Sequence, residues 1–143
     1  MRRVLLAVDG SELSDRAVQQ LLAMRNEFRD PAAVEIHLLN VQNPVPGDVS
    51  SFVAKDTLQE YHRERGDAAM ASARATLQVA GLSFKEHQRV GQPGATIAEV
   101  ARAEQCDLII MGTRGQGSAS AALLGSVAQG TLEHCTAPVL LVK

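Results

Sequence analysis

The stretch from Leu108 to Ser126 constrains the fold of this chain more than any other part of the sequence. It begins with four apolar residues, Leu108–Met111, which are typical of a β-strand buried on both faces. Glycines recur at positions 112, 115, 117 and 125, and a helical pattern begins directly at Ser126. A buried strand, a glycine-rich loop and a helix N-terminus in this order predict an α/β fold with a parallel sheet.

This loop has the chemistry of an anion-binding site. The first N–H groups of a helix have no partner within the helix, and the helix dipole places roughly half a positive charge there. Glycine lets the backbone approach phosphate oxygens without an intervening Cβ, and it adopts positive φ at little cost. We therefore interpret Gly125 and Ser126 as candidate phosphate ligands, with the Ser126 hydroxyl also able to contact a metal. The alternative, that the glycines only turn the chain, stays open.

Two other phosphate-binding motifs are excluded. A Walker loop needs a lysine before its Ser or Thr, but no lysine occurs between Lys85 and Lys143. The dinucleotide fingerprint also fails, because Ser120 stands where its third glycine belongs and the loop follows a late strand rather than the first.

Length and composition narrow the function further. The 143 residues predict a single domain over 1–143, and the net charge of −2 argues against a partner bound through a nucleic-acid backbone. Only 3% of residues are aromatic, so base stacking on single-stranded nucleic acid is not expected. The sequence shows no signal peptide and no membrane span, so we expect a cytoplasmic protein. Its two cysteines, Cys106 and Cys135, are interpreted as structural thiols.

Hydrophobic periodicity predicts five strands that alternate with four helices. The strands are expected at 4–8, 34–41, 83–90, 108–111 and 138–142, with the polar 83–90 segment at an edge. The helices are expected from about 13 to the Asp30-Pro31 stop, over 51–80 with a possible bend at Gly66, from Pro93, and over 126–134. Segment 43–47 is expected to be irregular. The charged face of the 51–80 helix, which includes Arg65, is interpreted as a solvated surface.

Several candidate residues follow from this layout. Asp9 lies at the carboxyl end of the first strand, where it either meets a ligand or holds a turn or helix cap, and Ser11 is another cap candidate. With right-handed crossovers, Asp9, Val41 and the 112–126 loop should surround one crevice. His37 has no second ligand at metal-binding spacing, so no metal site is expected there.

The spacing Gly112, two residues, Gly115, nine residues, Gly125-Ser126 resembles the G-x2-G-x9-G-S/T motif of the ATP-binding members of the universal stress protein family. Further similarities are the opening strand that ends in Asp9-Gly10-Ser11, the Gly91-x-Pro93 start of the third helix, and the closing segment 137–142. The resemblance implies a Rossmann-like, open five-stranded parallel sheet of order 3-2-1-4-5, with helices on both faces.

The resemblance also implies a nucleotide site at the carboxyl ends of the strands. By this similarity Asp9 lies near the nucleoside, and the Val41 backbone recognises adenine. Gly112 and Gly115 approach ribose and phosphates, and Gly125-Ser126 holds the phosphate tail with a divalent ion such as Mg²⁺. Residues 116–124 contain no cation, which leaves Arg114 as the only expected positive side chain nearby. The protein ligands of the metal stay unknown.

Three functions remain open. The first is a regulatory module that binds ATP without catalytic residues, and the second is a slow ATP hydrolase that uses the same site. The third is an acyl or phosphoester hydrolase with Ser11 or Ser126 as nucleophile, which lacks a Gly-x-Ser-x-Gly elbow and an evident histidine base.

The last strand, 138–142, is expected to form a homodimer. It is apolar up to Lys143, and unprotected edge strands tend to pair with another chain. Family members commonly pair these strands antiparallel.

Overall fold

The computed structural model describes residues 3–115 and 123–143. A five-stranded parallel sheet runs in the order β3-β2-β1-β4-β5, which confirms the expected topology. The strands are β1 (Arg3–Ala7), β2 (Glu35–Gln42), β3 (Phe84–Val90), β4 (Leu108–Gly112) and β5 (Val139–Val142). The longer helices are α1 (Glu12–Arg25), α3 (Lys55–Val79), α4 (Pro93–Ala103) and α5 (Ser126–His134), and the short ones are η1 (Pro31–Ala33) and α2 (Gly47–Ser50).

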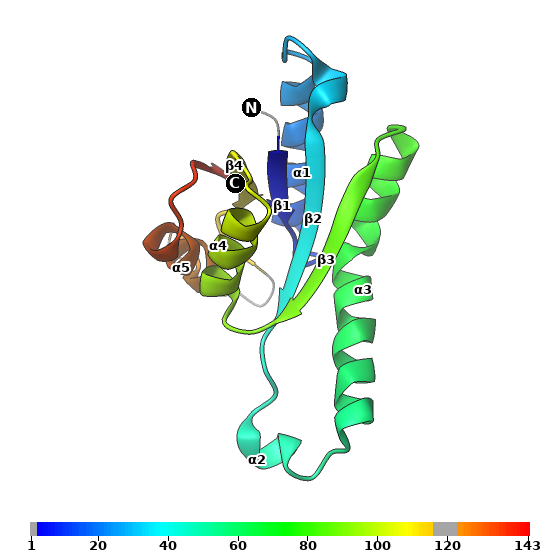
Figure 1. Ribbon diagram of the computed structural model, residues 1–143, viewed down its shortest axis with the longest axis vertical. Helices are drawn as coiled ribbons and strands as arrows, with labels where there is room; N and C mark the ends of the chain where they lie inside the picture. The colour runs from blue at the N-terminus through cyan, green and yellow to red at the C-terminus, as the bar shows by residue number, and fades with distance from the viewer. Residues whose placement is uncertain (1–2, 116–122) are drawn as a thin grey trace.

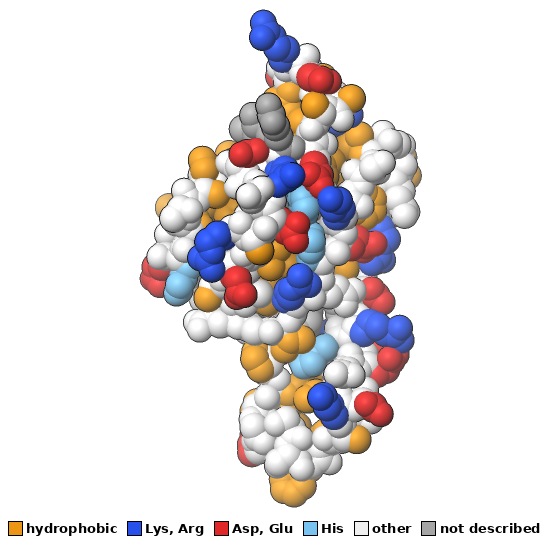
Figure 2. Space-filling view, in the orientation of Figure 1, with side chains coloured by type: hydrophobic (Ala, Val, Ile, Leu, Met, Phe, Trp, Pro, Cys, Tyr) orange, Lys and Arg blue, Asp and Glu red, His pale blue; other side chains and the backbone are white. Residues whose placement is uncertain are grey.

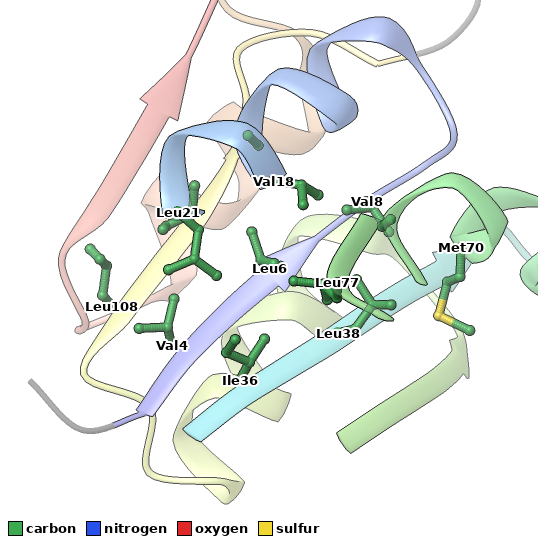
Figure 3. Packing of buried hydrophobic residues seen from close by; sticks show 13 residues of the cluster. Val4, Leu6, Val8, Val18, Leu21, Ile36, Leu38, Met70, Leu77 and Leu108 are labelled. Carbon is green, nitrogen blue, oxygen red and sulfur yellow. The ribbon is translucent and has the colours of Figure 1, made fainter. Parts of the chain in front are cut away.

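The helices cover both faces of the sheet, α1 and α3 on one and α4 and α5 on the other (Figure 1). Alternation along β1 directs Val4 and Leu6 into the cluster beneath α1 and α3, and Leu5 into the cluster beneath α4 and α5. Figure 3 shows the first cluster, in which Leu21 of α1 and Leu77 of α3 point toward β1 and β2. These side chains are fully buried, so both faces of the central strands are apolar.

Two helix boundaries differ from the sequence expectations, and one short helix, α2, was not expected. Helix α1 ends at Arg25, before the Asp30-Pro31 stop. The predicted 51–80 helix is wrong at its start, because α3 begins at Lys55. The separate turn of α2, at Gly47–Ser50, shares only Gly47 with the 43–47 segment expected to be irregular. Phe52 between these helices is 90% exposed, so no core contact extends α3 toward it.

Glycines in α3 and α4 mark close packing rather than bends. Helix α3 is continuous through Gly66, where a Cβ would lie 2.9 Å from the side-chain oxygen of Gln88 on β3. Gly94 of α4 lies against Gly130 of α5, and a Cβ on Gly94 would approach the Gly130 backbone to 2.5 Å. This contact holds α5 close to α4 and so fixes the direction of its N-terminus.

Candidate functional site

A cleft of about 930 Å³ opens at the carboxyl ends of β1, β2 and β4. In open α/β sheets ligands bind at this end, where the strand order reverses, and here that point lies between β1 and β4. All the residues that the sequence nominated lie along its walls. They are Asp9, Val41, Gly112, Arg114, Gly115, Gly125 and Ser126.

Asp9 connects β1 to the start of α1. Its Oδ1 accepts hydrogen bonds from the Ser11 N–H at 2.9 Å and from the Ser14 hydroxyl at 2.8 Å. Ser11 is the N-cap of α1, as expected, and its hydroxyl accepts the Ser14 N–H at 3.2 Å. Asp9 therefore holds the turn into the helix and also faces the cleft, so the two alternatives for this carboxylate are compatible.

Gly10 is the residue of this turn that the sequence reasoning did not single out. It has φ of +84°, a left-handed conformation that side chains rarely adopt. The Asp-Gly-Ser sequence was the available signal. Gly10 directs the chain over the end of the sheet, so Asp9 and Ser14 both border the cleft.

The glycines of the loop allow close packing within the chain, whereas their expected approach to phosphate oxygens stays a prediction. Gly112, Gly115 and Gly125 do not have positive φ, so conformational freedom does not explain them. A Cβ on Gly112 would lie 2.8 Å from the Leu13 side chain, and a Cβ on Gly115 would collide with Asp9 Oδ2. These glycines allow the loop to pack against the β1–α1 turn, and their cleft-facing surface is a consequence of that packing.

The N-terminus of α5 faces the cleft without a capping side chain. Gly125 is its N-cap, no capping hydrogen bond comes from a side chain within residues 3–115 or 123–143, and the first turn carries no acidic residue. The Gly125 N–H donates to the Thr113 carbonyl at 2.7 Å, which ties the two sides of the glycine loop together. Residues 116–122, which include Gly117, lie outside the described residues. The free N–H groups and the helix dipole make this end of the cleft suited to an anion.

The positive charge of the cleft comes from two elements rather than one. Arg114 lines it, as expected, but so does Arg65 of α3, which the sequence analysis assigned to a solvated face. The Arg65 guanidinium carbon lies 5.6 Å from the centre of the Tyr61 ring, one turn earlier on the same helix. The α3 helix extends past the carboxyl ends of the strands, which brings its middle to the cleft (Figure 1). Periodicity in the sequence identifies the polar face of a helix, but it does not show which other part of the molecule that face borders.

Asn40 positions the β2 side of the cleft and was also missed by sequence reasoning. It is only 2% exposed, its amide donates to the Val8 carbonyl at 2.8 Å, and its side-chain oxygen accepts from Gln42 at 2.7 Å. These bonds hold the end of β1 beside the end of β2, next to Val41. A polar residue within an otherwise apolar strand was the available signal.

The cleft offers little for nucleophilic catalysis. Its described lining contains no histidine and no cysteine, so a serine there would lack an imidazole base. Ser11 is occupied in capping α1, whereas Ser126 is exposed at the start of α5. Within residues 3–115 and 123–143, no helix combines the length and apolarity needed to span a membrane.

Comparisons with known proteins agree with this geometry. Residues 1–143 match the universal stress protein family. A universal stress protein of Thermus aquaticus is 30% identical over 142 residues, which cover 99% of this chain and 98% of that protein. The solved structure of protein MJ0577, from Methanocaldococcus jannaschii, superposes with a TM-score of 0.82 at 30% identity, covering 99% of this chain and 95% of that one. A universal stress protein of Archaeoglobus fulgidus, solved in complex with dAMP, shares the fold with a TM-score of 0.66 at 19% identity, covering 100% and 98%.

Proposed function

The chain belongs to the universal stress protein family, and from that premise we propose that it is a regulatory module that binds Mg-ATP in the cleft at the carboxyl ends of its strands. The observation that carries the proposal is the uncapped N-terminus of α5, which faces a cleft of about 930 Å³ together with Arg65 and Arg114. Pockets for small ligands typically have volumes of roughly 300–1,000 Å³. The dAMP complex of the Archaeoglobus relative supports the choice of a nucleotide.

The proposed pose places the base at β2 and the phosphates at α5. The Val41 backbone recognises adenine, Asp9 lies near the ribose, and Gly112 and Gly115 form the floor between them. Gly125 and Ser126 border the phosphate tail. The Ser126 N–H and hydroxyl hold it, because the Gly125 N–H already donates to the Thr113 carbonyl. The two arginines balance phosphate charge that the N–H groups alone would not offset.

The oxygen atoms present in the cleft are suitable ligands for a magnesium ion that binds together with the nucleotide. Mg²⁺ prefers oxygen ligands and usually combines phosphates and water with one or two protein groups. Asp9 and Ser126 are the oxygen-bearing side chains of the cleft that the pose places beside the nucleotide. When bound, the ion neutralises phosphate charge.

We favour binding over hydrolysis because the described cleft contains no evident water-orienting base. Efficient phosphoryl transfer needs a group that positions the attacking water and strong charge stabilisation at the γ-phosphate. Asp9 is the one carboxylate in the described lining, and its Oδ1 already accepts two hydrogen bonds from the β1–α1 turn. Slow hydrolysis at the same site is the second candidate.

We further propose a cytoplasmic homodimer that forms through β5. This strand pairs with β4 on one side and ends the sheet on the other. Leu140 and Leu141 pack against opposite clusters, so the edge offers its backbone and half-buried apolar side chains to a second copy. Sedimentation showing only monomer at micromolar concentration, with an intact C-terminus, would contradict this assembly.

Calorimetric titration of the purified chain with Mg-ATP, ADP, AMP and adenosine tests the nucleotide proposal. We expect saturable binding of one ATP per chain and weaker binding of adenosine. Mass analysis of the nucleotide carried through native purification, and single-turnover assays with labelled ATP, then separate the two candidates. A binding module returns ATP intact, whereas stoichiometric conversion to ADP favours the hydrolase. No heat with any nucleotide would refute both.

A further inference from the structure

A second polar cluster lies outside the nucleotide cleft, on the face of the sheet that α4 covers. Figure 2 shows histidine side chains among acidic and basic ones on this face. His37 of β2 and His87 of β3 meet there, and Glu104 directly follows α4. Potential ligand atoms of these three residues lie within 4.8 Å of one another, and none of the three lines the cleft.

The two imidazoles meet edge to edge through one nitrogen each. His37 Nδ1 lies 2.8 Å from His87 Nε2, and the rings are nearly parallel, at 16°, with centroids 5.1 Å apart. Strand pairing explains the contact, since Leu39 is opposite His87 and His37 is its diagonal neighbour. The two histidines are 50 residues apart in the chain, which is why spacing along the sequence did not reveal them.

The surroundings prepare His37 to be a ligand. Its side chain is 1% exposed, and Nε2 has no hydrogen-bond partner among the described residues but lies 3.5 Å from Glu35 Oε1. The carboxylate favours the proton on Nε2 and so leaves the Nδ1 lone pair toward His87. A carboxylate behind the outer nitrogen of a histidine is the usual support of a metal-ligating imidazole.

Charge is balanced around the pair. Glu35 and Glu104 favour the charged form of His37, while Lys85 and Arg3 oppose it, and burial outweighs them so that its pKa is lowered. Burial and the proximity of His37 likewise lower the pKa of His87.

We propose that His37, His87 and Glu104 form a binding site for a divalent transition metal, with Zn²⁺ as its expected occupant. Two imidazoles, one carboxylate and a water complete the tetrahedral set that zinc takes in proteins. Tetrahedral bonds of about 2.0–2.1 Å place ligand nitrogens about 3.3 Å apart, so the rings must part and turn until both lone pairs converge on the ion. The proton that His87 Nε2 donates to His37 Nδ1 must then move to Nδ1 of His87. His87 is half-buried on the edge strand β3, and Glu104 is half-buried at the end of a helix, so both can adjust.

The ion would bridge the end of α4 to β2 and β3, two strands that already pair with each other. It would tie the edge strand β3 and the carboxyl end of α4 to β2, and binding only the folded chain would raise its melting temperature. This site goes beyond the proposed nucleotide function, because its residues belong to a different part of the sheet.

Titration of the untagged, chelator-treated protein with ZnCl2, without nucleotide, tests the proposal. We expect one Zn²⁺ per chain and a higher melting temperature. The His87→Gln variant should bind at least about 100-fold more weakly and Glu104→Gln about tenfold, because changing groups that merely orient ligands already costs roughly 10–100-fold. Both side chains are partly exposed, so these variants avoid the folding risk of replacing buried His37. Unfolding curves of the metal-free variants check this.

His134→Gln is the matched control. His134 borders a separate pocket of about 280 Å³ with Cys106 and Cys135, so this variant controls for Zn²⁺ bound by thiols elsewhere on the chain. This variant should bind Zn²⁺ like the parent, and Co²⁺ should give a visible spectrum without thiolate charge-transfer bands. The proposal is overturned if the parent binds no Zn²⁺, if folded His87→Gln binds it equally, or if His134→Gln abolishes binding.

Discussion

Replacing Arg65 by glutamine should weaken ATP binding while leaving adenosine binding unchanged. Two unit charges at about 4 Å interact by about 1 kcal/mol at the dielectric constant of water and about 4 kcal/mol at a value near 20. Arg65 is exposed on α3, so the lower figure applies and predicts an approximately fivefold increase in Kd for ATP. The loss should shrink in 0.5 M salt, because screening shortens the reach of exposed charges.

Arg63→Gln provides the control for this experiment. Arg63 is also exposed on this helix, but it pairs with Glu60 at 2.6 Å and is not part of the cleft. Calorimetry with ATP and adenosine should separate the two variants. Equal losses of ATP affinity in the Arg65→Gln and Arg63→Gln variants would show that only the overall charge of the protein affects binding. Equal losses of ATP and adenosine in Arg65→Gln would show that the arginine does not face the phosphates.

Three further outcomes follow from packing and titration. Gly94→Ala should lower the free energy of unfolding, measured with denaturant, by about 1–3 kcal/mol, because the new Cβ would collide with the Gly130 backbone. An unchanged free energy of unfolding would contradict the close contact between α4 and α5. In a Cys135→Ser variant, Cys106 should react slowly with thiol reagents at pH 8, because burial raises its pKa to about 11. Fast labelling of Cys106 in the folded variant would contradict this prediction. Burial lowers the pKa of His87 in the folded protein from its ordinary 6.5. As the pH falls, the unfolded chain therefore binds a proton at this residue before the folded chain does. The free energy of unfolding of the metal-free protein should decrease as the pH drops below about 6.5. Unfolding curves at pH 7.5 and 5.5 should show a smaller drop for His87→Gln.

Sequence patterns predicted the sheet well because its strands are buried on both faces. The apolar runs at 4–8 and 108–111 can only be covered by helices on two sides, and the polar 83–90 segment is β3 at the edge of the sheet. Strand bounds shifted by only about one residue. Helix bounds were less certain around Phe52, because a solvent-exposed turn carries no periodic signal.

The site was predictable where a residue follows a strand and unpredictable where it comes from elsewhere. Asp9, Val41 and the loop glycines lie at or after the carboxyl ends of strands that meet at one edge, so the topology alone gathers them. Arg65 lies in the middle of a helix, and His87 joins His37 only through strand pairing. The loop glycines also carry a second role, since Gly112 and Gly115 contact Leu13 and Asp9, so their replacement perturbs packing as well as any ligand.

The central claim is that nucleotide phosphates lie at the N-terminus of α5. Backbone amide shifts of ¹⁵N-labelled protein during titration with Mg-ATP and with adenosine test it most directly. We predict that ATP, but not adenosine, shifts the amides of Gly125, Ser126 and Val127 strongly, because only ATP brings an anion to the N–H groups of Ser126 and Val127. The same anion would lie beside the Gly125 N–H, which donates to the Thr113 carbonyl. Both ligands should shift Val41. ATP-dependent shifts that bypass residues 125–127, or that match those of adenosine there, would contradict the account.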